Sequence, residues 1–112
     1  MRKIEQEMLN AIREGKNWSK GNTMVVFHKN DDPGPYYSVF LFGNEIARGV
    51  QGKTPFMINF CGWVSKTTAS RFHALGVPAG SLKWRAVLDG KEVDPHGWIF
   101  VAEITGKFMS NL

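Results

Sequence analysis

Residues 23–60 consist of four short apolar runs separated by turn sequences, and this pattern constrains the fold more than any other feature. The runs are rich in β-branched and aromatic residues, as strands are, and cover residues 23–28, 36–42, 45–50 and 56–60. Turn-forming residues lie between them at 30–35, 43–44 and 51–55, and Gly43–Asn44 is typical of a two-residue II′ hairpin. Strands joined so directly pair with their sequence neighbours, so the sequence predicts an antiparallel β meander.

A helix is predicted ahead of the meander, over residues 2–14. Ile4, Met8 and Ile12 recur at a spacing of four, which places them on one face of a helix. Gly15 then provides the residue type at which helices commonly end. This helix therefore presents an apolar stripe to the rest of the domain.

A second, shorter helix is predicted after the meander, over residues 68–75. Ser65 or Thr67 can cap its start, and Gly76 follows its end. We expect both helices to pack on one face of the sheet. The core residues expected on this basis are Ile4, Met8, Ile12, Val39, Leu41, Phe72 and Leu75.

The last third of the sequence returns to a strand-like pattern. Residues 82–88 alternate, Asp89–Gly90 is a strong type I′ turn signal, and residues 98–104 predict a final strand. Residues 107–112 are expected to fray. The order of elements predicts an α+β fold: an N-terminal helix, an antiparallel β meander, a short second helix and a C-terminal β hairpin or strand pair. No linker divides residues 1–112, so we expect a single domain.

The composition is that of a soluble globular domain. Of the 112 residues, 43% are hydrophobic and 21% are charged. No apolar run approaches the roughly 18 residues of a membrane span, and the charged first residues lack the apolar core of a secretion signal. A single cysteine, Cys61, cannot form an internal disulfide. We therefore expect a protein of a reducing compartment, with no membrane partner.

The sequence contains no residue pattern typical of an enzyme or a metal protein. Its three histidines and Cys61 lack the spacing of metal ligands. Cys61 ends an apolar strand, where a buried, inert thiol is expected. Residues 49–54 match only the end of a phosphate-binding loop. We therefore predict no catalytic residues, no metal and no cofactor.

Charge and aromatic content favour a binding protein. Fourteen Lys and Arg against ten Asp and Glu give a net charge of +4, which favours polyanionic partners. Four Trp, eight Phe and two Tyr exceed what the core of so small a domain needs. Some of these aromatic side chains should therefore lie on the surface, where they favour a partner or a homo-oligomer.

Hydroxyl and basic residues concentrate in residues 65–71, around the predicted start of the second helix. Unpaired backbone N–H groups at a helix start, together with hydroxyls and cations, suit a phosphate. The alternative is that the hydroxyls only cap the helix and that both cations are solvated. The arginine could equally reach a carboxylate on the sheet. The candidate phosphate-binding residues are Lys66, Thr67, Thr68, Ser70 and Arg71.

A second basic pair lies in the last third of the sequence. Lys83 and Arg85 point to one face of the strand predicted over residues 82–88, and they are candidates for contacts to nucleic-acid phosphates. Trp63 and Trp84 are the candidates for stacking on bases. These residues form one basic patch with the start of the second helix if the two faces coincide.

Part of the chain resembles the double-stranded-RNA-binding domain. The order helix, meander, helix over residues 2–76 is similar, as are Gly34–Pro35 and the turn at residues 42–45. That family opens its last helix with a Ser-Lys-Lys motif that grips phosphates. Here only Lys66 and Arg71 stand in for its three basic residues. The resemblance implies a phosphate-binding start of the second helix.

A larger part of the chain resembles a group of small proteins carried by tailed bacteriophages. The resemblance spans most of the sequence and rests on residues 4–13, 39–47, 62–63, 67–71 and 97–99. It implies a phage protein that acts in the cytoplasm of the bacterial host, and it implies little about mechanism.

These observations predict a non-enzymatic phage protein that binds nucleic acid through a basic patch at the helix start and the sheet. Two alternatives stay open. One is an anti-defence or host-takeover protein that binds a host protein through its aromatic residues. The other is a sponge that sequesters a nucleotide signal. Nucleic-acid binding should weaken steeply with salt, whereas an aromatic protein interface should not.

Overall fold

The computed structural model describes residues 1–30 and 34–106, and within them it contains three helices and nine strands. The helices are α1 (Lys3–Glu14), α2 (Lys66–Ala74) and α3 (Val101–Thr105). The strands are β1 (Trp18–Lys20), β2 (Thr23–His28), β3 (Tyr36–Leu41), β4 (Asn44–Gly49), β5 (Pro55–Ile58), β6 (Ala79–Leu82), β7 (Arg85–Leu88), β8 (Lys91–Glu92) and β9 (Ile99–Phe100). This arrangement confirms the predicted α+β class.

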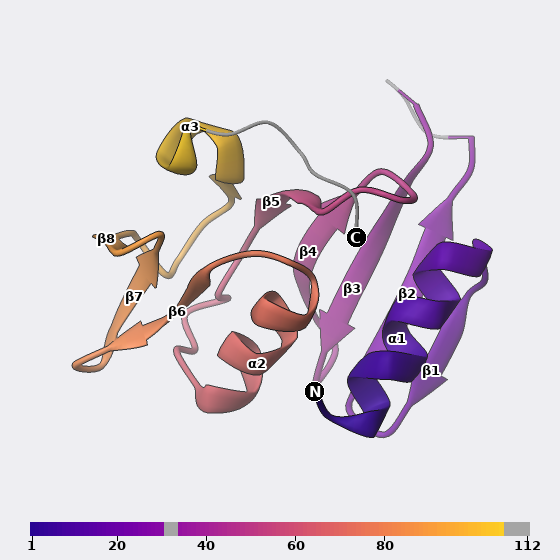
Figure 1. Ribbon diagram of the computed structural model, residues 1–112, viewed down its shortest axis with the longest axis horizontal. Helices are drawn as coiled ribbons and strands as arrows, with labels where there is room; N and C mark the ends of the chain where they lie inside the picture. The colour runs from indigo at the N-terminus through magenta and orange to yellow at the C-terminus, as the bar shows by residue number, and fades with distance from the viewer. Residues whose placement is uncertain (31–33, 107–112) are drawn as a thin grey trace.

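Six strands form one antiparallel sheet, in the order β1-β2-β3-β4-β5-β9. The first five follow sequence order, which confirms the predicted meander. The remaining strands form a smaller antiparallel sheet in the order β6-β7-β8. Figure 1 shows this second sheet extending from the body of the molecule beside α2.

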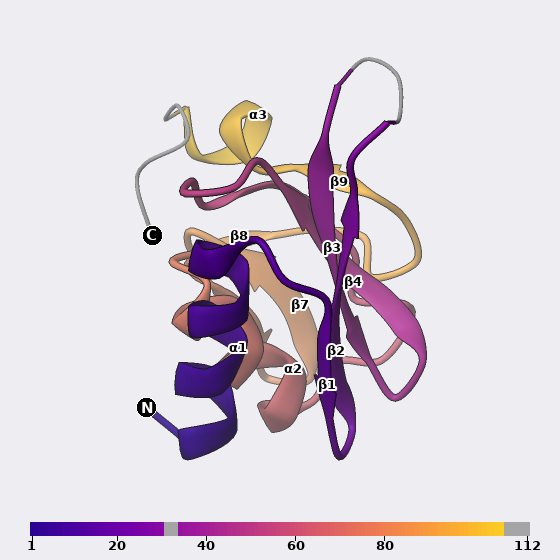
Figure 2. The same cartoon turned by 90° about the vertical axis from the view of Figure 1, so that its right-hand side faces the viewer.

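Both α1 and α2 cover the same face of the large sheet, as Figure 2 shows. Met8 and Ile12 of α1 and Phe72 of α2 are completely buried between the helices and the sheet. The ring of Phe72 meets the ring of Phe60 edge to face, with centroids 5.1 Å apart. Of the seven predicted core residues, six are buried, and Ile4 is half-buried.

The prediction of one continuous strand over residues 82–88 is wrong, because a tight turn divides this segment. Lys83 and Trp84 have φ angles of 50° and 68°, so the chain reverses there and β6 pairs with β7. Positive φ at both central positions is the combination found in a type I′ turn, which bulky residues rarely adopt. Lys83 therefore lies in a turn and does not share a strand face with Arg85.

The strand predicted over residues 98–104 is also wrong for most of its length. Only Ile99 and Phe100 pair with β5, and the chain continues as α3. Ala102 is a strong helix former, and Gly106 ends the helix in the left-handed conformation, with φ of 70°. The expected fraying at 107–112 lies outside the described residues.

Two smaller features also differ from the prediction. The chain makes an additional strand, β1, where residues 17–22 carry no clear strand pattern, and it pairs with β2. The hairpin between β3 and β4 has Phe42 and Gly43 at its centre, because Leu41 pairs with Asn44. Their φ angles of 52° and 79° match a type I′ turn and not the predicted II′ turn.

Candidate nucleic-acid interface

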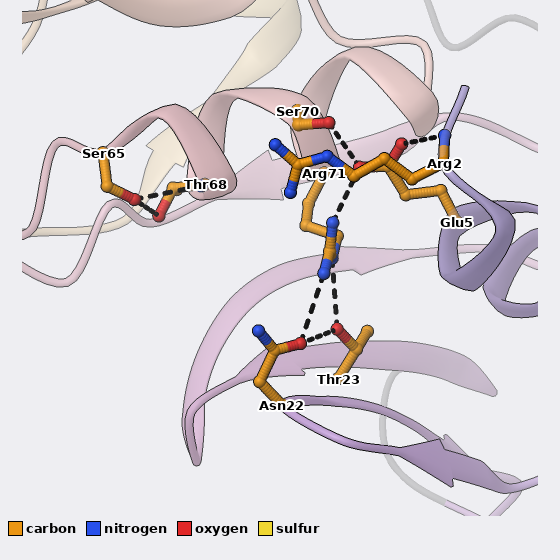
Figure 3. Close-up of polar contacts among 8 residues, drawn as sticks. All are labelled: Arg2, Glu5, Asn22, Thr23, Ser65, Thr68, Ser70 and Arg71. Atoms are coloured by element: carbon orange, nitrogen blue, oxygen red, sulfur yellow. Dashed lines mark hydrogen bonds and ion pairs between the residues drawn. The ribbon is translucent and has the colours of Figure 1, made fainter.

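The hydroxyls around the start of α2 serve the helix itself. Ser65 is the capping residue: its Oγ accepts a hydrogen bond from the backbone N–H of Thr68 at 3.1 Å. The Oγ1 atom of Thr68 lies close to the Ser65 hydroxyl (Figure 3), at 3.0 Å, and the side chain of Thr68 is buried. Lys66 is exposed and Thr67 is half-buried beside it. At this helix start, Lys66 is thus the predicted residue that faces solvent.

Arg71 is buried, with a relative exposure of 2%, and all three of its nitrogens bond inside the protein (Figure 3). Its Nη1 donates to Oε2 of Glu5 in α1 at 2.8 Å. Its Nε donates to Oγ1 of Thr23 at 3.1 Å, and its Nη2 donates to Oδ1 of Asn22 at 3.2 Å. The guanidinium thus joins α2 to α1, to the turn before β2 and to the first residue of β2. The carboxylate that it reaches belongs to a helix and not to the sheet.

Ser70 completes the shell around Glu5. Its hydroxyl donates to Oε2 of Glu5, and the backbone N–H of Arg2 donates to Oε1 at 3.1 Å. Burial by itself would raise the pKa of the Glu5 carboxyl. These hydrogen bonds and the charge of Arg71 outweigh burial and hold this pKa below its usual range. Glu5 is therefore ionised at neutral pH, and its carboxylate accepts the hydrogen bond that the Ser70 hydroxyl donates.

An open groove of about 500 Å³ lies between the start of α1 and one side of α2. It brings together Lys66 and Ser70, two of the predicted site residues, with the exposed His73. Arg71 does not line it. The complete lining is Met1, Glu5, Lys66, Ala69, Ser70, His73 and Ala74.

The hairpin of β6 and β7 presents the other predicted residues. Trp84 has a relative exposure of 91%, the largest among the exposed large hydrophobic side chains of the described residues. Lys83 and Arg85 flank it and are exposed, and Leu82 before them is 59% exposed. Arg85 donates to Oε1 of Glu92 at 3.1 Å, and both side chains of this pair face solvent. In Figure 1 this hairpin points away from the body.

Trp63 lies two residues before the cap of α2 and is 54% exposed. Its ring stacks on that of Phe42, with centroids 5.6 Å apart and planes inclined by 22°. Phe42 is itself 57% exposed. The two predicted stacking residues are therefore both on the surface, in two separate loops.

Sequence reasoning missed a polar cluster on the face of the large sheet opposite the helices. Ser38 on β3 is completely buried, and its hydroxyl donates to Oε2 of Glu45 on β4. His28 Nε2 lies 2.9 Å from the same hydroxyl oxygen, so the ring donates its Nε2–H to Ser38. Because the serine proton points to the carboxylate, His28 is not placed to act as a base for a serine nucleophile.

Arg48 holds the other side of this cluster. Its Nε and Nη2 donate to the two carboxylate oxygens of Glu45 at 2.8 and 2.9 Å. Its guanidinium also lies 4.5 Å from the ring centroid of Trp98 and 5.6 Å from that of Tyr36. Burial would raise the pKa of Glu45, but the hydrogen bonds from Arg48 and Ser38 hold it below its usual range.

A β-bulge explains why this cluster escaped prediction. Positions 45 and 48 point to opposite faces of a regular strand, since side chains alternate. The register shifts between Val39 and Phe40, which brings Glu45 and Arg48 onto one face. Alternation along β3 places Tyr36 and Ser38 on one face, and this was the available sequence signal, but it does not indicate Glu45 or Arg48 as their neighbours.

Cys61 is exposed, so the prediction of a buried thiol is wrong. The residue lies in a turn with φ of 56°, which lifts it out of the strand. Its Sγ still lies 3.3 Å from the carbonyl oxygen of Glu45. Partial burial of the sulfur, and then the charge of Glu45, raise the pKa of the thiol. The thiolate is therefore disfavoured at neutral pH.

The described residues contain neither a cluster of metal ligands nor a helix that could span a membrane. In residues 1–30 and 34–106, no three His, Cys, Asp or Glu side chains come together as metal ligands would. No helix in this part of the chain is both long and apolar enough to cross a membrane.

Comparison with known proteins places the chain in a family of phage proteins. A family model described as Kyanoviridae Gp96 protein matches residues 1–92. No curated protein and no solved structure matches the chain. These comparisons give no support to a likeness with double-stranded-RNA-binding domains. The match covers α1, the meander, α2 and the whole second sheet, and the chain belongs to the Kyanoviridae Gp96 family of phage proteins.

Proposed function

We propose that this phage protein binds nucleic acid, with the β6–β7 hairpin as its main contact. The observation that carries the proposal is the exposure of Trp84 at 91% between two cations, Lys83 and Arg85, at the end of a projecting hairpin. An aromatic ring beside positive charges matches the two parts of a nucleic acid, its bases and its phosphates.

The conformation of this turn supports a role in binding. Residues with positive φ are costly unless they are Gly, Asn or Asp, and a bulky residue there is rare. The next turn of the same sheet has Asp89 and Gly90 at the equivalent positions, with φ angles of 53° and 78°. The chain thus uses the favoured residues in one turn, and Lys83 and Trp84 in the other. Turn formation does not explain a tryptophan there, whereas display of its ring does.

The cations of the site are available for phosphates. The pair between Arg85 and Glu92 is exposed, and such pairs contribute at most about 1 kcal/mol, so a phosphate can compete for the guanidinium. Lys66 and Thr67, at the start of α2, add a second group of contacts. We leave Thr68, Ser70 and Arg71 out of the contact surface, because their polar atoms already bond within the protein.

One observation favours the alternative of a host-protein partner. Leu82 lies beside Trp84 and is 59% exposed, and a Leu–Trp pair is also what an apolar protein pocket takes up. Nucleic-acid binding and host-protein binding differ in their response to salt. A protein interface centred on these two side chains keeps its affinity between 50 and 200 mM salt, whereas phosphate binding does not.

Fluorescence anisotropy with labelled oligonucleotides, titrated across this salt range, tests the proposal. We expect log K to fall linearly with log salt concentration, and Lys83→Gln and Arg85→Gln each to reduce the slope by about one. Lys16→Gln removes an exposed lysine that lies two residues after α1, and it serves as the matched control, with no change in slope. Absence of binding to every oligonucleotide, with salt-independent capture of a host protein, contradicts the proposal.

The other properties expected of the protein stay predictions: no catalytic activity, action in the host cytoplasm, and a homo-oligomer. The last rests on exposed apolar side chains such as Met24 and Phe100 on the large sheet. Sedimentation velocity at increasing concentration tests it, and a monomer at the highest concentration contradicts it.

A further inference from the structure

We propose, on the basis of the function proposed above, that the ligand is single-stranded nucleic acid and that Trp84 stacks on an unpaired base. A ring exposed to 91% leaves its faces open to solvent. In a duplex the bases stack on one another, and a protein reaches only their edges in the grooves. In a single strand the faces of the bases are available to an aromatic side chain.

Trp63 provides a second stacking position. Phe42 covers one face of its ring at 5.6 Å, yet the residue remains 54% exposed. Phe42 also supports the ring, so Trp63 offers a surface that needs little ordering when a base binds. Its turn has Cys61 and Gly62 at positive φ, and the backbone N–H of Trp63 donates to the carbonyl of Phe60 at 3.0 Å, which closes this turn.

Each stacking position has a cation close by in the chain. Lys83 and Arg85 are the neighbours of Trp84, and Lys66 follows Trp63 by three residues. Aromatic residues interspersed with cations are characteristic of proteins that bind single strands without strict sequence preference, because every base has a π face and every nucleotide has a phosphate.

The charges of the second sheet disfavour a duplex. Glu92 on β8 pairs with Arg85, and Asp89 is exposed in the turn between β7 and β8. A duplex is stiff, with a persistence length of about 150 base pairs, so a duplex laid along this sheet keeps its phosphates close to both carboxylates. A flexible single strand can contact the tip of the hairpin and turn away from Asp89, which follows the other end of β7.

The test compares affinities for a labelled single strand of 12 nucleotides and for a 12-base-pair duplex of the same sequence, by anisotropy at 100 mM salt. We expect the single strand to bind at least about tenfold more tightly. Trp84→Ala should weaken single-strand binding about 5- to 150-fold, the range of one lost base–aromatic stack. Trp84→Phe should keep most of the affinity. Val50→Ala, which truncates an exposed apolar residue directly after β4, is the control and should change nothing.

Trp84→Leu separates stacking from simple apolar contact, because leucine keeps apolar area but has no π face. Single-strand affinity equal to that of the wild type in this variant overturns the inference. Equal or tighter binding of the duplex also overturns it and leaves the proposed function standing, with the ring acting as a wedge between base pairs. Failure of both oligonucleotides to bind overturns the proposed function itself. Circular dichroism confirms that each variant is folded.

Discussion

Trp84 and Gly90 occupy the same position in two successive turns of the small sheet, with φ angles of 68° and 78°. Glycine adopts this conformation at little cost, whereas tryptophan does not. One turn joins β6 to β7 and the other joins β7 to β8, and the two differ mainly in the side chains that they expose to solvent. Comparison of these two turns therefore distinguishes residues that the turn conformation requires from residues that serve binding.

Replacement of Lys83–Trp84 by Asn–Gly should stabilise the protein and strongly weaken nucleic-acid binding. Asn–Gly is the preferred pair for a type I′ turn, and Trp84 is too exposed to contribute much packing. The gain from relieving two strained residues exceeds the flexibility that glycine adds to the unfolded chain, for a net stabilisation of about 1 kcal/mol. Urea denaturation measures it. A loss of stability would show that the Trp84 ring packs on the protein in solution.

Glu5→Gln should cost about 3–5 kcal/mol, because it leaves the charge of Arg71 buried without a counter-ion. Glu7→Gln is the matched control: Glu7 lies two positions along the same helix and pairs with Lys20 at the surface. Its loss should cost about 1 kcal/mol or less. Thermal denaturation compares the two variants, and equal effects would contradict the strong role of the buried pair.

Stability should decline on acidification because Glu5 and Glu45 both have a pKa below the usual range in the folded state. Unfolded carboxyls bind protons near pH 4.3, and the folded ones do so only at lower pH, so the unfolded state binds more protons in between. The contribution of both groups is complete above about pH 5 and is lost as the pH falls through the folded pKa values. Urea denaturation at pH 7, 5, 4 and 3 should show this decline, and Glu5→Gln should make it shallower. A constant midpoint across this range would contradict the assignment.

Phe72→Ala should cost about 3–5 kcal/mol, because the side chain is completely buried and packs against Phe60. Val50→Ala truncates an exposed residue and should change stability by less than about 0.5 kcal/mol. Denaturant unfolding provides both values. A cost below about 1 kcal/mol for Phe72→Ala would place this residue outside the core.

Local sequence patterns predicted the parts of the fold that local interactions determine. The spacing of Met8 and Ile12 identified α1, and the β-branched and aromatic residues of 23–28 identified β2. Asp89–Gly90 was identified as a turn for the same reason, since its residue types match the conformation. Lys83–Trp84 adopts the same conformation with residues that do not favour it, and sequence reasoning therefore extended a strand through it.

The rest of the candidate site depends on contacts between distant parts of the chain and on an irregularity in strand pairing, and neither can be read from local sequence. Nothing near Arg71 in the sequence shows that its partner is Glu5, because the contact depends on how α1 and α2 pack on the sheet. The pairing of Glu45 with Arg48 depends on a bulge, which no local signal indicated. In both cases a pair of charged residues holds parts of the structure together.

The pairing of Glu5 with Arg71 also orders events during protein synthesis. The two residues are 66 positions apart, so at ribosomal rates of about 5–20 residues per second the arginine is added about 3–13 s after the glutamate. Until then α1 carries a carboxylate on the face that will be buried, with no counter-ion to neutralise it. A nascent chain released within the meander cannot complete this pair, and the Glu5 carboxylate of α1 then lacks its buried counter-ion. Unfinished chains of this protein should therefore remain sensitive to host proteases, whereas complete chains fold and become resistant.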